Sequence, residues 1–244
     1  MAGHSKWANI KHKKAAQDAK RGKVFTKIIK ELMVSAKSGG SDPEANPRLR
    51  QAISTAKAAN MPNDTMNRAI QKGAGELEGT NYEEMTYEGF GPGGAAILMD
   101  IMTDNKNRTV AEIRHLMAKY GGNLGDNGSV SWMFEKLGQI SIVANGHDEN
   151  KVFEEVLEIG ADDFIFSDNV FLITTDPSNT VDISDQLINK GYSIISSGIE
   201  MVPKNTLKVE GDDVKKLINL IENLEEHDDI QNIYSNFEVD DDQL

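Results

Sequence analysis

The spacing of apolar residues in the first third of the chain predicts helices. Between Ala19 and Lys37, apolar side chains recur every three or four positions, and lysines occupy the opposite side of the helical wheel. The apolar positions are Phe25, Ile28, Ile29, Leu32 and Ala36, and the lysines are Lys20, Lys23, Lys27, Lys30 and Lys37. This pattern predicts an amphipathic helix with an outer face of ammonium groups, which Gly39-Gly40 ends.

Two further helices are predicted in the same region. Asn46 and Pro47 have the residue types of a helix cap and a first helical position, and the apolar stripe of the second helix starts at Leu49. Met61-Pro62 breaks this helix and starts a third one, whose outer face carries Arg68, Gln71 and Lys72. Two helices joined by a short turn also fit a helix-turn-helix, but we favour a plain helical bundle.

Beyond residue 78, strands alternate with helices. The pattern predicts strands at Tyr82 to Phe90, Ala95 to Met102 and Val130 to Phe134, and a helix from Arg108 to Tyr120. From about Gly138 to Val202 the order is β-α-β-β-α-β, which is the ferredoxin-like unit. A strand, a helix and a second strand follow between Thr206 and Phe237. These three elements are too few to fold alone, so we expect them to complete the domain that starts with the strand Tyr82 to Phe90.

The predicted fold class is therefore multidomain, α and α+β, with the ferredoxin-like domain inserted in the other α+β domain. The limits are 1–78 for a basic all-helical domain, 79–136 and 204–244 for the α+β domain, and 137–203 for the insertion. The ends of the insertion, Phe134 to Gly138 and Val202 to Thr206, are expected to lie side by side.

Charge divides the chain in the same way. The 244 residues have a net charge of −13, but residues 1–75 carry +10 and residues 76–244 carry −23. This distribution predicts a polyanion-binding arm on an acidic body that nucleic acid would repel. The alternative is a solvated lysine-rich helix without a partner.

Several classes of chemistry are excluded or disfavoured. The absence of cysteine rules out disulfides, thiolate metal sites and iron–sulfur clusters. The glycines of Gly89 to Gly94 join a strand to a strand, whereas a phosphate loop feeds a helix. The five histidines are scattered, and the acidic clusters fit helix ends and a solvated tail. We therefore expect no enzyme, no cofactor and no metal site.

The chain is expected to be cytoplasmic and to have no membrane partner. No apolar run approaches the roughly 20 residues that a membrane helix needs. Met1 to Ile10 lacks the apolar stretch of a secretory signal.

The leading segment is the candidate nucleic-acid site. Lysines and arginines contact phosphate, and a flat aromatic or imidazole side chain stacks on an unpaired base. The candidate residues are Lys6, Trp7, Lys11, His12, Lys13, Lys14, Lys20, Arg21, Lys23 and Lys27. The alternative for Trp7 and Ile10 is that they pack on the helical bundle, which would still leave the lysines outside.

Several long motifs resemble the YebC family. They are Met1 to Trp7 with Ile10 to Lys14, Lys20 to Lys27, Tyr87 to Gly94, and Gly121 to Gly125 with Gly128 to Phe134. The resemblance covers essentially the whole chain. It implies a helical N-terminal domain and two α+β domains, the third inserted in the second. It also implies a DNA-binding transcriptional regulator, while mitochondrial relatives activate translation, in particular of cytochrome c oxidase, and bacterial relatives are viewed as ribosome-associated factors.

Three functions are compatible with these observations. The first is a DNA-binding transcriptional regulator, and the second is a ribosome-associated factor that binds ribosomal RNA and relieves stalling on proline-rich sequences. The third is a protein-interaction module without nucleic acid. The absence of a clear recognition helix and the presence of Trp7 among cations both favour RNA. The pattern sets no oligomeric state.

Overall fold

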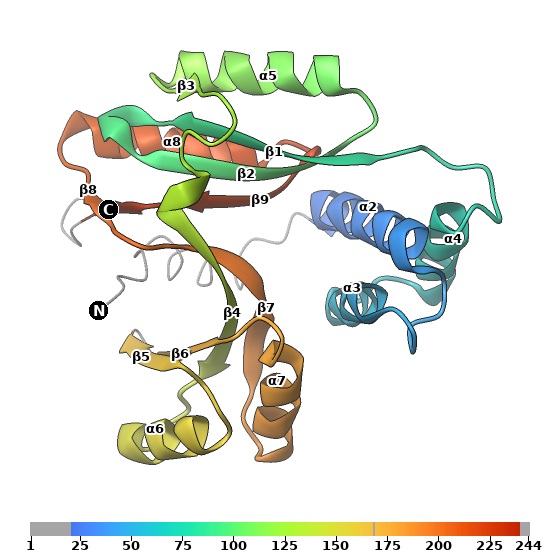
Figure 1. Ribbon diagram of the computed structural model, residues 1–244, viewed down its shortest axis with the longest axis vertical. Coiled ribbons are helices and arrows are strands. Elements are labelled where there is room, and N and C mark those ends of the chain that lie inside the picture. Colours follow the sequence, from blue (N-terminus) through green and yellow to red (C-terminus); the bar gives the residue numbers. More distant parts are fainter. Residues whose placement is uncertain (1–20, 168, 240–244) are drawn as a thin grey trace.

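The computed structural model describes residues 21–167 and 169–239. They form a helical domain, a second domain on a four-stranded sheet, and a ferredoxin-like domain inserted in the second. In Figure 1 the helical domain lies to one side, and the inserted domain lies at the lower end, on long strands that descend from the second domain. The predicted fold class is confirmed.

Within the described residues, three helices make up the helical domain: α2 (Arg21–Gly39), α3 (Pro47–Ala58) and α4 (Asn63–Gly73). As predicted, Asn46 caps α3, because its side-chain oxygen accepts a hydrogen bond from the Leu49 N–H at 3.1 Å. The same side chain donates to the Ser35 carbonyl at 2.8 Å and thereby ties α3 to α2. The core between the helices includes Ile28, Leu32, Leu49, Ala52, Ala56, Met66 and Ala69.

The second domain is a sheet in the order β3-β1-β2-β9. Its strands are β1 (Glu83–Phe90), β2 (Ala96–Thr103), β3 (Asn123–Leu124) and β9 (Ile230–Ser235). Helices α5 (Lys106–Lys119) and α8 (Asp212–Glu225) pack on one face, and the short strands β8 (Leu207–Lys208) and β10 (Phe237–Glu238) pair in parallel beside them.

Both faces of β2 are buried, and this explains its continuous apolar sequence. Ile97, Met99 and Ile101 join the core under α5 and α8. The alternating residues Ala96 and Leu98 point to the other face and join a smaller core at the root of the inserted domain.

The inserted domain is a sheet in the order β5-β6-β4-β7 with two helices. The elements are β4 (Phe134–Val143), α6 (Glu149–Glu158), β5 (Asp163–Ser167), β6 (Val170–Thr175), α7 (Thr180–Asn189) and β7 (Ile194–Pro203). Phe134 pairs with Pro203 and Glu135 with Val202, so the two ends of the insertion lie side by side as expected. The limits at 136/137 and 203/204 stay a prediction, and the strand β4 runs through the first of them.

The turn between β1 and β2 is a single 3₁₀ turn, η1 (Pro92–Gly94), as the glycines there predicted. Gly93 and Gly94 have φ angles of 71° and 81°, which a side chain disfavours. A Cβ atom on Gly93 would also lie only 2.9 Å from Val209 Cγ1. Glycine therefore meets a conformational and a packing requirement at this position.

The predicted strand at Val130 to Phe134 is wrong. A 3₁₀ turn, η2 (Ser131–Met133), occupies this stretch, and β4 begins only at Phe134. The buried carboxylate of Glu88 accepts hydrogen bonds from the N–H groups of Val130 and Ser131 at 2.7 and 2.8 Å. These donors are therefore not available to a strand partner. The short strand β3 was not predicted either.

Among the described residues, no helix has the length and apolar character needed to cross a bilayer.

Candidate nucleic-acid interface

Lysines of α2 contact the C-terminal end of α8. Lys23 Nζ donates to the Glu226 carbonyl at 2.9 Å, and Lys27 Nζ donates to the Glu225 carbonyl at 3.0 Å. The last carbonyls of a helix have no partner within the helix and carry partial negative charge. These two predicted site residues therefore also attach the helical domain to the second domain.

Lys30 continues this face of α2 but is buried, with 4% of its surface exposed. Its Nζ donates to the Asp229 carboxylate at 2.6 Å and to the carbonyls of Asp228 and Met102 at 2.8 and 3.3 Å. The prediction of an outer ammonium face is therefore wrong at Lys30. Helical periodicity alone could not show that a buried carboxylate, 199 positions away, would receive this lysine.

Asp229 is the centre of this contact. Its second oxygen accepts hydrogen bonds from Thr109 at 2.7 Å, Arg108 at 2.9 Å and Thr103 at 3.2 Å. Burial would raise the pKa of Asp229, but the hydrogen bonds from Lys30, Thr109 and Arg108 outweigh it and hold the pKa well below its usual range. The carboxylate is therefore charged and matched by two cations.

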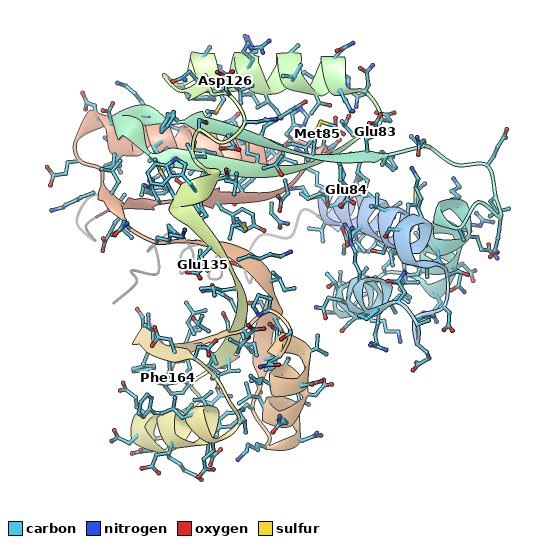
Figure 2. The ribbon with its side chains drawn as sticks, in the orientation of Figure 1. Glu83, Glu84, Met85, Asp126, Glu135 and Phe164 are labelled. Carbon is cyan, nitrogen blue, oxygen red and sulfur yellow. The ribbon has the colours of Figure 1, made fainter. Side chains whose placement is uncertain are left out.

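A second ion-pair network joins the same two domains nearer to α3. Arg48 binds Glu31 of α2 at 2.7 Å and Glu84 of β1 at 2.6 Å. Figure 2 shows Glu84 where β1 passes α2. The hydrogen bonds from Glu84 and Glu31 raise the pKa of the Arg48 guanidinium. The helical domain thus contacts the second domain at two separate points.

Other cations of the helical domain face solvent. Lys57 on α3 and both Arg68 and Lys72 on α4 are exposed, and within the described chain none of their side chains has an ion pair or hydrogen bond. Asn67 and Gln71 are exposed on the same helix, α4. This part of the surface combines cations that suit phosphate with amides that suit base edges.

A further aromatic candidate is Trp132 of η2, which is 64% exposed. Its indole N–H donates to the Ser129 carbonyl at 3.1 Å, and Lys204 Nζ donates to the backbone carbonyl of Trp132 at 3.1 Å. Glu88 fixes the preceding loop through the N–H groups of Gly128, Val130 and Ser131. The indole is thus held on an ordered turn. Sequence reasoning missed it, although its motif was noted as a resemblance.

An open cleft of about 490 Å³ lies beside the Lys30–Asp229 contact. Its lining contains more carboxylates than cations, so it does not suit a phosphate group. Glu112, His227 and Asp229 place potential ligand atoms within 4.8 Å of one another. However, the His227 ring nitrogens contact Glu112 and the Asp229 N–H, and the Asp229 carboxylate already binds Lys30 and Arg108. This donor set does not fit a metal ion.

The described residues thus include only part of the predicted site. Of its residues, Lys23 and Lys27 are placed, and both lie on α2 next to α8. Lys6, Trp7, Lys11, His12, Lys13, Lys14 and Lys20, and the side chain of Arg21, lie outside the described residues.

Comparison with known protein families covers nearly all of the chain. The family described as "TACO1/YebC protein N-terminal domain" matches residues 5–76. The one described as "TACO1/YebC second and third domain" matches residues 82–237. Residues 77–81, between α4 and β1, separate the two matches.

Individual relatives agree with these matches. A protein of Natranaerobius thermophilus, named "Probable transcriptional regulatory protein", is 53% identical over 99% of this chain and 98% of its own length. A protein of Geobacter sulfurreducens with the same descriptive name is 50% identical over 98% of this chain and 96% of its own length. The crystal structure of a conserved hypothetical protein from Aquifex aeolicus has a TM-score of 0.85 at 44% identity, and covers 92% of this chain and 93% of its own. The chain therefore belongs to the TACO1/YebC family, many of whose members are named as regulators of transcription.

Proposed function

We propose that the chain is a nucleic-acid-binding regulator of gene expression, and specifically a non-catalytic, DNA-binding transcriptional regulator. The observation that carries this proposal is the separation of charge. Residues 1–75 carry +10 and residues 76–244 carry −23, and three cations of the helical domain are exposed without partners in the described chain. A polyanion is attracted to one domain and repelled by the others, which restricts how the two molecules dock.

The exposed face of α4 supports DNA as the target. Arginine pairs with guanine edges in the major groove, and asparagine or glutamine pairs with adenine edges. Asn67, Arg68 and Gln71 offer these groups on one helix, and Lys72 adds a cation for phosphate. The sequence pattern had already placed Arg68, Gln71 and Lys72 on the outer face of this helix, and the exposed Asn67 adds a second amide beside them. The names of the relatives point in the same direction.

Trp132 favours the second candidate, a ribosome-associated factor that binds ribosomal RNA and relieves stalling on proline-rich sequences. Its exposed indole offers an unpaired base a plane for stacking, as RNA-binding proteins commonly do. In this alternative the predicted residues Lys11, Lys13 and Lys14 contact phosphates of the ribosomal RNA.

Crosslinking in living cells, followed by sequencing of the bound DNA and RNA, tests the proposal. A transcriptional regulator is expected to enrich DNA upstream of genes. Enrichment of ribosomal RNA would instead support the translation factor. If neither nucleic acid is enriched over a mock-crosslinked sample, the proposed function is wrong.

Two matched double variants make this experiment specific. K57E/R68E reverses one lysine and one arginine of the helical domain, and R114E/K215E reverses one of each in the second domain. All four side chains are exposed, so neither variant should unfold the protein. Only K57E/R68E is expected to lower the yield of crosslinked nucleic acid. An equal loss in both variants would show that total charge, and not this surface, determines binding.

A further inference from the structure

An exposed apolar patch lies on α6 and β5 of the inserted domain. We call it the α6–β5 patch and define it by Phe153, Leu157 and Phe166, which are 44%, 45% and 43% exposed, together with the half-buried Phe164. Phe153 and Leu157 are four residues apart and therefore lie on the same side of α6. Phe164 and Phe166 alternate along β5 and share one face of the sheet. Four large apolar side chains from two elements thus form one surface.

Aromatic contacts hold this surface in place. The Phe164 ring stacks on the buried Phe171 ring with 5.2 Å between centroids, and the Phe166 ring lies 4.8 Å from it. The Phe153 ring meets the edge of Phe164 at 5.8 Å. Such contacts keep the rings ordered before any partner arrives, so a partner would lose little side-chain freedom on their account.

The core of the domain does not need these exposed groups. Val152 and Val156, on the inner face of α6, are fully buried and already fill the space against β6, where Ile173 is also buried. Phe153 and Leu157 therefore remain at the surface although the helix has its own buried stripe. Large apolar side chains that gather on an ordered surface in this way mark an interaction site.

Carboxylates surround the patch. Glu149, Glu154 and Glu158 of α6 and Asp162 before β5 are exposed, and within the described chain none of their carboxylates has an ion pair or hydrogen bond. The only lysine of α6, Lys151, lies 3.8 Å from the carboxylate of Glu155 and so faces a different acid. The rim of the patch is thus strongly negative.

The position of the patch separates it from the candidate nucleic-acid interface. β5 is an edge strand of its sheet. Figure 1 shows α6 and β5 at the end of the inserted domain that points away from α2, α3 and α4. In Figure 2, Phe164 marks the same corner. A partner bound here would leave the helical domain accessible.

We propose that the α6–β5 patch docks a cationic segment of another protein whose apolar side chains cover Phe153 and Leu157. Apolar anchors supply the affinity and the acidic rim selects a basic partner. The same carboxylates repel a phosphate backbone. They also repel the equivalent patch of a second copy, because a two-fold contact would place like charges together. This surface goes beyond the proposed function, since it adds a protein partner to the nucleic acid.

A synthetic helical peptide of leucine and lysine, with the leucines along one face, is the probe, and fluorescence anisotropy measures its affinity for the full-length protein. F153A/L157A is expected to weaken binding at least about tenfold, because it removes both apolar anchors. The matched control is V181A/I188A, which truncates two residues of α7 that are 47% and 53% exposed. It should leave the affinity unchanged.

Charge is tested separately. E154Q/E158Q should weaken binding and reduce its salt dependence, and a peptide with glutamate in place of lysine should not bind. Equal affinities for F153A/L157A and the wild type, or equal losses in F153A/L157A and V181A/I188A, would overturn the proposal. Self-association of the wild-type protein that is lost in F153A/L157A would also overturn the proposal, because the patch would then bind a second copy of the chain. F153A/L157A should retain the wild-type affinity for nucleic acid, so failure here is distinguishable from failure of the proposed function.

Discussion

At the scale of single residues, Glu88 shows how one buried carboxylate shapes a loop. It is 7% exposed and accepts hydrogen bonds from three backbone N–H groups, those of Gly128, Val130 and Ser131. Burial would raise its pKa, but these hydrogen bonds outweigh burial and lower it. The Glu88 carboxylate therefore accepts the hydrogen bonds that a neighbouring strand would otherwise accept from this stretch. It also fixes the turn that carries Trp132, the residue after Ser131.

Replacing this residue gives the first prediction. Glu88→Ala leaves the three N–H groups without an acceptor, and we expect a loss of about 2–3 kcal/mol in the free energy of unfolding. Urea unfolding measures it, and Trp132 fluorescence should become more sensitive to quenchers as the turn loosens. Thr86→Ala, at an exposed position of the same strand, is the control for β1. An unchanged unfolding midpoint for Glu88→Ala would mean that water replaces the carboxylate without cost.

At the scale of elements, the contact between α2 and the end of α8 depends on the Lys30–Asp229 pair. Both side chains are 6% exposed and lie 2.6 Å apart. Asp229→Asn keeps the shape but leaves the Lys30 ammonium buried without a counter-charge, so we expect a loss of about 3–5 kcal/mol. Unfolding in urea at pH 7 measures this loss. Asp228→Asn is the neighbouring control, because Lys30 contacts only the backbone carbonyl of Asp228.

The same pair predicts a pH dependence. Because the pKa of Asp229 is lower in the folded protein, its contribution to stability is present above the ordinary carboxyl pKa of about 4. It is lost as the pH falls below that value, toward the folded pKa. Stability measured from pH 7 to pH 2 should therefore fall more steeply at the acid end in the wild type than in Asp229→Asn. Parallel curves would show that the charge of Asp229 does not contribute to stability.

Local patterns were sufficient to predict most elements but not the contacts between distant ones. The cap at Asn46 and the order of strands and helices in the inserted domain depend on neighbouring residues, and both were predicted from them. The outer face assigned to Lys30 was wrong because its partner Asp229 is 199 positions away. The strand predicted at Val130 was wrong because Glu88, 42 positions earlier, binds its N–H group. Both errors arose where a buried charge finds its partner across the fold.

At the scale of the whole molecule, the insertion places two chemically different surfaces at separate ends. The helical domain carries the exposed cations Lys57, Arg68 and Lys72, and the α6–β5 patch belongs to the inserted domain. Figure 1 shows α2, α3 and α4 apart from α6 and β5. The long strands β4 and β7, which pair from Phe134 and Pro203 to Ile142 and Ile194, join the inserted domain to the second domain. The proposed protein partner and the proposed nucleic acid would therefore not compete for one surface.

The salt dependence of nucleic-acid binding tests this separation of charge. If six of the predicted site residues meet phosphates of duplex DNA, a plot of log K against log salt concentration should have a slope of about −5. The same contacts on single-stranded RNA should give about −4, because fewer counterions are released for each phosphate. If Lys57 and Arg68 contact phosphates in addition to these six, the slope should be steeper by up to about 2. K57E/R68E should remove this increment, and R114E/K215E should leave the slope unchanged. A slope near zero would contradict phosphate binding, whereas equal changes in both variants would show that total charge, and not the surface of the helical domain, determines binding.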